Sequence, residues 1–114
     1  MARGFGGPRG PHGMNKLLKQ VEKTMEQVMQ AQEELRSQKV DASSGGGTVK
    51  VTANAAGEVL SVKIAPEAVD PDDVEMLEDL VLAAVRDALE KAKAIRDEKM
   101  SALAEGLPEL PGIL

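Results

Sequence analysis

The sequence has no cysteine, no tryptophan and no tyrosine, and it has one phenylalanine and one histidine among its 114 residues. Without cysteine, neither disulfide bonds nor thiolate metal sites can form, which suits a reducing cytoplasm. Because Phe5 is the only large aromatic side chain, stacking of nucleic-acid bases on aromatic residues is not expected. The core must instead be built from Val, Leu, Ile, Met and Ala.

Long apolar runs are also missing, since no segment reaches the roughly 18 residues that a membrane-spanning helix needs. The first residues, MARGFGGPRGPHG, carry arginines but no apolar stretch, so we expect no secretory signal there. We predict a flexible Gly/Pro/Arg-rich arm over residues 1–13, a single domain over residues 14–105 and an extended tail over residues 106–114. No contact with a membrane is expected.

The residues that usually assemble an active site are scarce. His12 lies on the predicted arm, there is no thiol, and the carboxylates gather mainly around the start of a predicted helix. A nucleophile, a base and an orienting group are therefore not brought together, and we predict no enzyme, no cofactor and no small-molecule substrate. A site made of carboxylates alone, in a cleft between two chains, is the remaining alternative.

Asp70, Asp72 and Asp73 form an acidic cluster just before an apolar periodic segment. In a helix that begins there, Asp70 would be the N-cap and Pro71 the first helical residue, with the other carboxylates near the positive end of the helix dipole. A metal site is the alternative, but the spacing of a calcium-binding loop is absent. We therefore predict helix capping rather than metal binding.

Two long helices are predicted, one on each side of a small sheet. In the first, over residues 14–38, apolar residues recur at alternating spacings of four and three, as in a coiled coil: Met14, Leu18, Val21, Met25, Val28 and Leu35. The second runs over residues 71–104 and is stopped by Gly106 and Pro108. At 1.5 Å per residue, the helices would be roughly 35–40 Å and about 50 Å long.

Between the helices, the segment KVDASSGGGTVKVTANAAGEVLSVKI alternates apolar and polar residues, which predicts a three-stranded antiparallel meander over residues 39–64. The glycines at 45–47 permit a turn with positive φ. The predicted fold class is α+β, in the order helix, three strands, helix. Because strands of about six residues span only about 20 Å, both helices must extend beyond the sheet as projecting arms.

A sheet of this size buries little apolar surface alone, and its edge and apolar face need a partner. We therefore predict a homodimer with the sheets at the interface, formed by the apolar residues of the last two strands: Val49, Val51, Leu60, Val62 and Ile64. We further expect the overhanging parts of the two helices to pair antiparallel. The start of the first helix and the end of the second would then share one far tip.

Charge is distributed unevenly along the chain, whose formal net charge is −5. No acidic residue precedes Glu22, whereas residues 66–114 carry thirteen acidic and five basic residues. The basic residues expected at the tip are Lys16, Lys19 and Lys23 on one face of the first helix, Arg96 and Lys99 on the second helix, and Arg3 and Arg9 on the arm. They favour contacts with nucleic-acid phosphates, and the alternative is a solvated basic face that only aids solubility.

Most of the chain resembles a known family. The segments SSGGGTVKVTANAAGEVLSVKI, PEAVDPDDVEMLEDLVLAAVRDALEKA and EKMSALAEGLPELPG are similar to those of the YbaB/EbfC family of bacterial nucleoid-associated DNA-binding proteins, from about Met14 to Gly112. The most specific pieces are the three glycines followed by VKV, the EMLEDLV at residues 75–81, and EKM followed by Gly106 and Pro111. Together they are far more specific than any one of them alone.

The resemblance implies a small cytoplasmic protein of the nucleoid that binds double-stranded DNA as a homodimer. It implies that the sheets associate, that the helical arms project like tweezers and contact the DNA, and that binding changes DNA conformation, gene expression and DNA protection. On this chain the arms correspond to residues 16–23 and 96–99. A link to recombination or repair proteins is also implied, whereas the roles of Arg3 and Arg9 rest on electrostatics alone.

The chemistry of the candidate residues predicts phosphate contacts with little reading of sequence. The alternative is a dimeric scaffold that binds another protein, such as a recombination or replication component, through its acidic cluster or through unfilled positions of the helical stripe such as Gln32.

Overall fold

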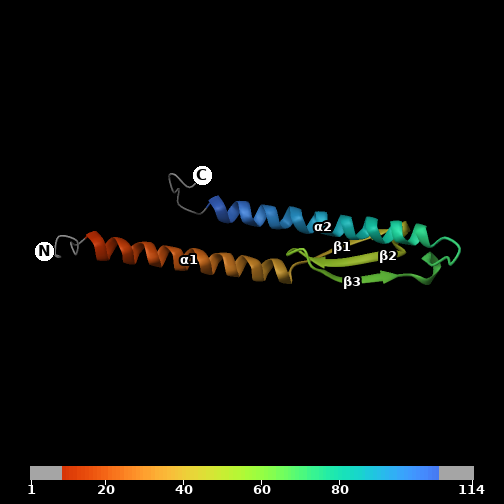
Figure 1. Cartoon of the computed structure of the whole chain (residues 1–114), viewed down its shortest axis with the longest axis horizontal. Coiled ribbons are helices and arrows are strands. Elements are labelled where there is room, and N and C mark those ends of the chain that lie inside the picture. Colours follow the sequence, from red (N-terminus) through yellow and green to blue (C-terminus); the bar gives the residue numbers. More distant parts are fainter. Residues whose placement is uncertain (1–8, 106–114) are drawn as a thin grey trace.

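The chain forms an elongated molecule with principal extents of 84 × 25 × 22 Å, and the computed structural model describes residues 9–105 of it (Figure 1). The order is α1 (Arg9–Ser37), β1 (Lys39–Ser44), β2 (Val49–Asn54), β3 (Val59–Ile64) and α2 (Val74–Glu105). Short 3-10 turns lie at Gly45–Gly47 and Pro66–Ala68. The predicted α+β class, with an antiparallel meander between two long helices, is confirmed.

The three strands form one antiparallel sheet in the order β1-β2-β3. The β1–β2 connection is tight because all three glycines of the turn have positive φ, with Gly46 at φ 68°. Side chains alternate between the two faces along β2, so that Val49, Val51 and Ala53 are fully buried while Lys50 is exposed. One face of the sheet is therefore core and the other faces solvent.

The buried face is covered by α2, and the contact is built from small residues. Ala84, Ala88 and Ala92 recur every four residues on one side of the helix and have no exposed surface. They pack against Val49, Val51 and Ala53 of β2 and the buried residues of β1, with larger apolar residues of α2 at the margins. Because alanine carries only a methyl group, the helix axis can lie close to the strands.

The helix covers only two of the three strands, since its contacts are with β1 and β2 and few are with β3. Leu60, Val62 and Ile64 on β3 consequently remain 50%, 42% and 40% exposed. Val49 and Val51 are different, because α2 already covers them within one chain. These two residues have no surface left for a partner, and their assignment to a dimer interface is corrected.

The start of α2 also differs from the prediction. Asp70 closes a turn, in which its carboxylate accepts a hydrogen bond from Asp72 N at 2.9 Å and its carbonyl accepts one from Asp73 N at 2.9 Å. The N-cap is Asp73, whose Oδ1 accepts a bond from Met76 N at 3.2 Å. Pro71 fits the second position of such a turn as well as the first helical position, so the helix begins three residues later than expected.

The other helix begins earlier than expected, at Arg9 instead of Met14, so part of the predicted flexible arm is helical. Pro11 is compatible with this start because it stands in the first turn, where a backbone N–H has no helical partner to lose. The side chains of residues 9–12 lie outside the described part of the chain. Residues 1–8 and 106–114, the rest of the predicted arm and the predicted tail, lie outside it altogether.

A single residue, Gln38, joins α1 to the sheet. Its N–H still bonds back to Glu34 O at 3.1 Å, while its carbonyl accepts a bond from Ala55 N at 2.8 Å in the β2–β3 turn. That turn is itself closed by two bonds between Asn54 and Glu58, one from Asn54 Nδ2 to Glu58 Oε1 at 2.8 Å and one from Glu58 N to Asn54 Oδ1 at 3.0 Å. The end of α1 is thus fixed to the near end of the sheet.

The alanine row predicts a large difference between two similar substitutions. Ala88→Leu inserts three carbon atoms into a fully buried contact and should destabilise the fold by about 1–3 kcal/mol. Ala94→Leu adds the same atoms at an exposed position of the same helix and should change stability by less than about 0.5 kcal/mol. Urea unfolding followed by circular dichroism measures both, and equal unfolding curves would contradict the packing described.

Candidate nucleic-acid interface

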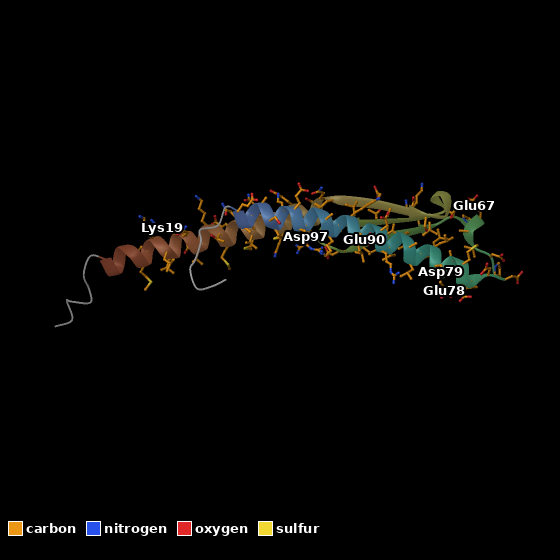
Figure 2. All side chains as sticks on the ribbon, turned by 90° about the horizontal axis from the view of Figure 1, so that it is seen from above. Lys19, Glu67, Glu78, Asp79, Glu90 and Asp97 are labelled. Atoms are coloured by element: carbon orange, nitrogen blue, oxygen red, sulfur yellow. The ribbon has the colours of Figure 1, made fainter. Side chains whose placement is uncertain are left out.

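The first candidate group, Lys16, Lys19 and Lys23, lies on the part of α1 that projects beyond the sheet (Figure 2). All three side chains are exposed. The residues are three and four positions apart, so they lie on one face of the helix over about 10 Å. None of the ion pairs found within the described residues involves them, so their positive charge is not neutralised by a neighbouring carboxylate.

The opposite face of this projecting segment is apolar and exposed. Met14, Leu18, Val21 and Met25 form the predicted coiled-coil stripe, and each is between 51% and 60% exposed. Only the last turns of α1 are buried against the rest of the molecule, at Ala31 and Leu35. Within one chain the stripe therefore has no helix to pair with over most of its length.

The second candidate group, Arg96 and Lys99, lies elsewhere. Arg96 stands beside the β2–β3 turn, with Nη1 3.0 Å from the position that a Cβ at Gly57 would take. Lys99 forms an ion pair with Glu34 of α1. Glu34 is eleven residues from Lys23, or about 16 Å along the helix. Arg96 and Lys99 are thus at the base of the arm and separate from the lysines on α1.

The two helices do run antiparallel where they meet, but the predicted shared tip is wrong. Gln27 and Gln30 of α1 line a shallow recess together with Ala102 and Leu103 of α2, so the end of α2 is level with the middle of α1. The beginning of α1 continues past it (Figure 1). The reason is that α2 uses most of its length to cross the sheet before it reaches α1.

The acidic residues lie at the other end of the molecule. Figure 2 shows Glu67, Glu78 and Asp79 far from Lys19. Closer to the arm, a hydrogen bond from Lys93 to Asp97 at 2.8 Å holds the pKa of Asp97 below its usual value, so this carboxylate stays charged beside its lysine. Among residues 9–105, no group of three His, Cys, Asp or Glu side chains is placed to hold a metal ion.

Two further candidates cannot be placed by their side chains. Arg3 lies outside the described residues, and Arg9 is the first residue of α1 but its side chain lies outside what the structure describes. Sequence reasoning also gave no role to Lys50 and Lys63. Their position opposite each other on β2 and β3 depends on strand register, which alternation of polar residues alone does not determine.

An apolar groove runs beside β3. It is lined by Ile64 of β3 and by Leu77, Val81, Leu82 and Val85 of α2, with Glu78 at its margin. Leu82 is 47% exposed, which is unusual for a leucine next to a core. The groove and the exposed apolar residues of β3 form one continuous surface, which is named the β3 flank below.

None of the helices within residues 9–105 is both long enough and apolar enough to cross a lipid bilayer.

Comparisons with known proteins agree on one family. The model of the YbaB/EbfC DNA-binding family matches residues 10–107. A nucleoid-associated protein of Pelotomaculum thermopropionicum is 46% identical over 100 residues, which cover 88% of this chain and 94% of that protein. One from Ruminiclostridium cellulolyticum is 44% identical over 115 residues and covers 99% of both chains.

A solved structure supports the fold. The crystal structure of an uncharacterized protein from Helicobacter pylori superposes with a TM-score of 0.72 and covers 79% of this chain and 95% of that one. Its sequence identity is 20%, so this likeness concerns the fold alone.

The ion pair between Lys99 and Glu34 generates a test of how α2 is fixed to α1. Lys99→Glu sets two carboxylates against each other and should lower the free energy of unfolding by up to about 1 kcal/mol, the range of exposed pairs. The double variant Glu34→Lys with Lys99→Glu restores opposite charges and should recover the loss. Urea unfolding of the two single variants and the double variant gives the coupling. Additive losses would show that the pair does not join the helices.

Proposed function

The chain belongs to the YbaB/EbfC DNA-binding family, and from this premise we propose that it binds duplex DNA with little sequence specificity and alters the conformation of the DNA. The observation that supports this most directly is the face of Lys16, Lys19 and Lys23, three exposed lysines without acidic partners on a projecting helix. The family is one of DNA-binding proteins and not of enzymes.

The proposed mechanism is neutralisation of phosphates. Duplex DNA carries one negative charge per about 1.7 Å of its axis, and a lysine that replaces a condensed counterion releases it to solvent, which favours binding. Lysine is a point charge on a flexible stem, so it fixes position without reading bases. Arg96 and Lys99 are proposed as weaker contacts, because Lys99 already pairs with Glu34. Arg3 and Arg9 are proposed contacts on electrostatic grounds alone.

The distribution of acids supports confinement of DNA to the arm. Glu78 and Asp79 belong to the acidic end of α2, far from Lys19 (Figure 2). Because like charges repel phosphates, DNA should avoid that end and remain at α1. A protein that holds DNA in this way in the nucleoid would contribute to nucleoid organisation, gene regulation and DNA protection.

A homodimer is the proposed assembly, and the β3 flank is the proposed interface. β3 is an edge strand with exposed backbone groups and exposed apolar side chains, and the groove beside it is almost wholly apolar. A second copy presents the same surface, so a two-fold axis at β3 would cover both flanks at once. Leu60, Val62 and Ile64 are retained as interface residues in this proposal.

A protein-binding scaffold linked to recombination or replication remains the second candidate. It is favoured by the exposed apolar stripe of α1, at Met14, Leu18, Val21 and Met25, because apolar stripes of this width commonly bind another helix. The two functions separate in a gel shift at physiological salt, where the scaffold alone would leave DNA unshifted.

The lysine face predicts a strong dependence on salt. With four to six phosphates neutralised per dimer, the logarithm of affinity should fall with the logarithm of salt concentration with a slope of about −4 to −5. Lys16→Gln, Lys19→Gln and Lys23→Gln together should bring this slope much closer to zero on unrelated sequences. Fluorescence anisotropy with mixed-sequence duplexes measures it, and Arg96→Gln with Lys99→Gln is the comparison that should have the smaller effect. A wild-type slope near zero would exclude the phosphate mechanism.

The interface predicts that one charge can separate the subunits. Leu82→Glu buries a carboxylate in the β3 flank if the dimer forms, so the variant should elute as a monomer. Ala83→Glu adds the same charge at the neighbouring exposed position, which points to another side of the helix, and should leave the dimer intact. Size-exclusion chromatography with light scattering gives both masses. A dimeric Leu82→Glu variant would place the interface elsewhere.

A further inference from the structure

The face of the sheet that is turned away from α2 is polar throughout. Because Val49, Val51 and Ala53 point toward α2, Lys50 and Thr52 point to the opposite face. Ser61 and Lys63 of β3 lie beside them and, with residues of β1, line a shallow recess open to solvent. This polar sheet face carries no α-helix above it, in contrast to the covered face.

Two lysines stand directly opposite each other on this face. Lys50 and Lys63 are register partners on β2 and β3, and Cβ atoms of such partners are about 5 Å apart. Like charges in this arrangement disfavour strand pairing. Thr52 and Ser61 are the next partners along the same two strands, so no side chain between the strands separates the two charges.

No carboxylate within the described residues neutralises either lysine. The acids nearest to the recess are already engaged: Asp41 accepts a hydrogen bond from Thr52 at 2.8 Å, and Asp87 pairs with Lys91 at 3.4 Å. On α2 the lysines behave differently, since Lys91, Lys93 and Lys99 each pair with a carboxylate. The sheet face thus keeps positive charge that most of α2 does not.

We propose that the polar sheet face, through Lys50 and Lys63, is a second surface that binds DNA phosphates. Unpaired ammonium groups beside serine and threonine hydroxyls are the donors that commonly contact phosphate oxygens. The inference rests on the proposed function for the identity of the ligand, duplex DNA. It differs from that function in placing a contact on the sheet and outside the helical arms.

The two surfaces are well separated. Lys23 is fourteen residues from the end of α1 at Ser37, which is about 21 Å of helix. Lys50 is four residues from Asn54, the end of β2 next to α1, which adds about 13 Å of strand. The total of about 35 Å is close to one helical turn of DNA. One chain can therefore contact DNA at two places about one turn apart.

The test uses the full chain and a 40-base-pair duplex of mixed sequence. Lys50→Gln with Lys63→Gln removes the sheet-face charges, and Arg86→Gln with Lys93→Gln removes two charges from exposed positions on the outward side of α2. The sheet variant should reduce the magnitude of the salt slope by about two per chain and weaken binding at least about tenfold at 0.1 M salt. The α2 variant should stay within about twofold of wild type, and Lys50→Arg with Lys63→Arg should bind like wild type because charge is kept.

A sheet variant with the salt slope and affinity of wild type overturns the proposal, and so does an equal loss in the α2 variant. Circular dichroism of each variant excludes unfolding as the cause of a loss. The outcome for the arm is read separately. If removal of the three α1 lysines has no effect while the sheet variant loses affinity, the arm assignment fails and the sheet surface stands. A wild type that binds no duplex overturns both.

Discussion

The width of one helix governs this structure. An α-helix with its side chains is about 10 Å across, and neighbouring strands are about 4.8 Å apart, so one helix covers two strands and no more. The alanine row of α2 is seated over β1 and β2, and its small side chains keep that contact close. β3 is the strand left over. Its exposed apolar residues follow from this geometry rather than from any weakness of the sequence.

The second constraint is length. The strands have six residues each, whereas α1 has 29 and α2 has 32, so neither helix can end where the sheet ends. The two helices use the excess differently. α2 spends most of its length over the sheet and leaves a short end beside α1, while α1 touches the sheet only at its last turn. The longer free arm therefore comes from the shorter helix, and it is the arm that carries the unpaired lysines.

The sequence predicts the meander closely because period-two alternation and three glycines constrain it locally. Each strand matches the expectation to within a residue, and Val49, Val51 and Ala53 do share one buried face. What covers that face was not predictable, because alternation identifies a face but not the layer that packs on it. Val49 and Val51 were assigned to a partner for this reason, when α2 of the same chain covers them.

Long-range geometry was equally hidden. The pattern gives helix lengths but not the offset between helices, so Arg96 and Lys99 were expected at the tip although they lie at the base of the arm. Local ambiguity explains the start of α2, since Asp70 followed by Pro71 suits a turn and a helix equally well and only Asp73 bonds to the helix. Strand register, which sets Lys50 against Lys63, is a property of the folded sheet.

The single residue between α1 and β1 has a consequence for the direction of the arm. Gln38 is bonded on one side to the last turn of α1 and on the other to the β2–β3 turn, so it leaves no slack between helix and sheet. Each residue turns a helix by about 100°. The lysine face is thus held at one angular phase relative to the sheet, and one residue more or fewer at this junction would rotate it about the arm without altering any lysine. The compass bearing of the charge is set where there is no charge at all.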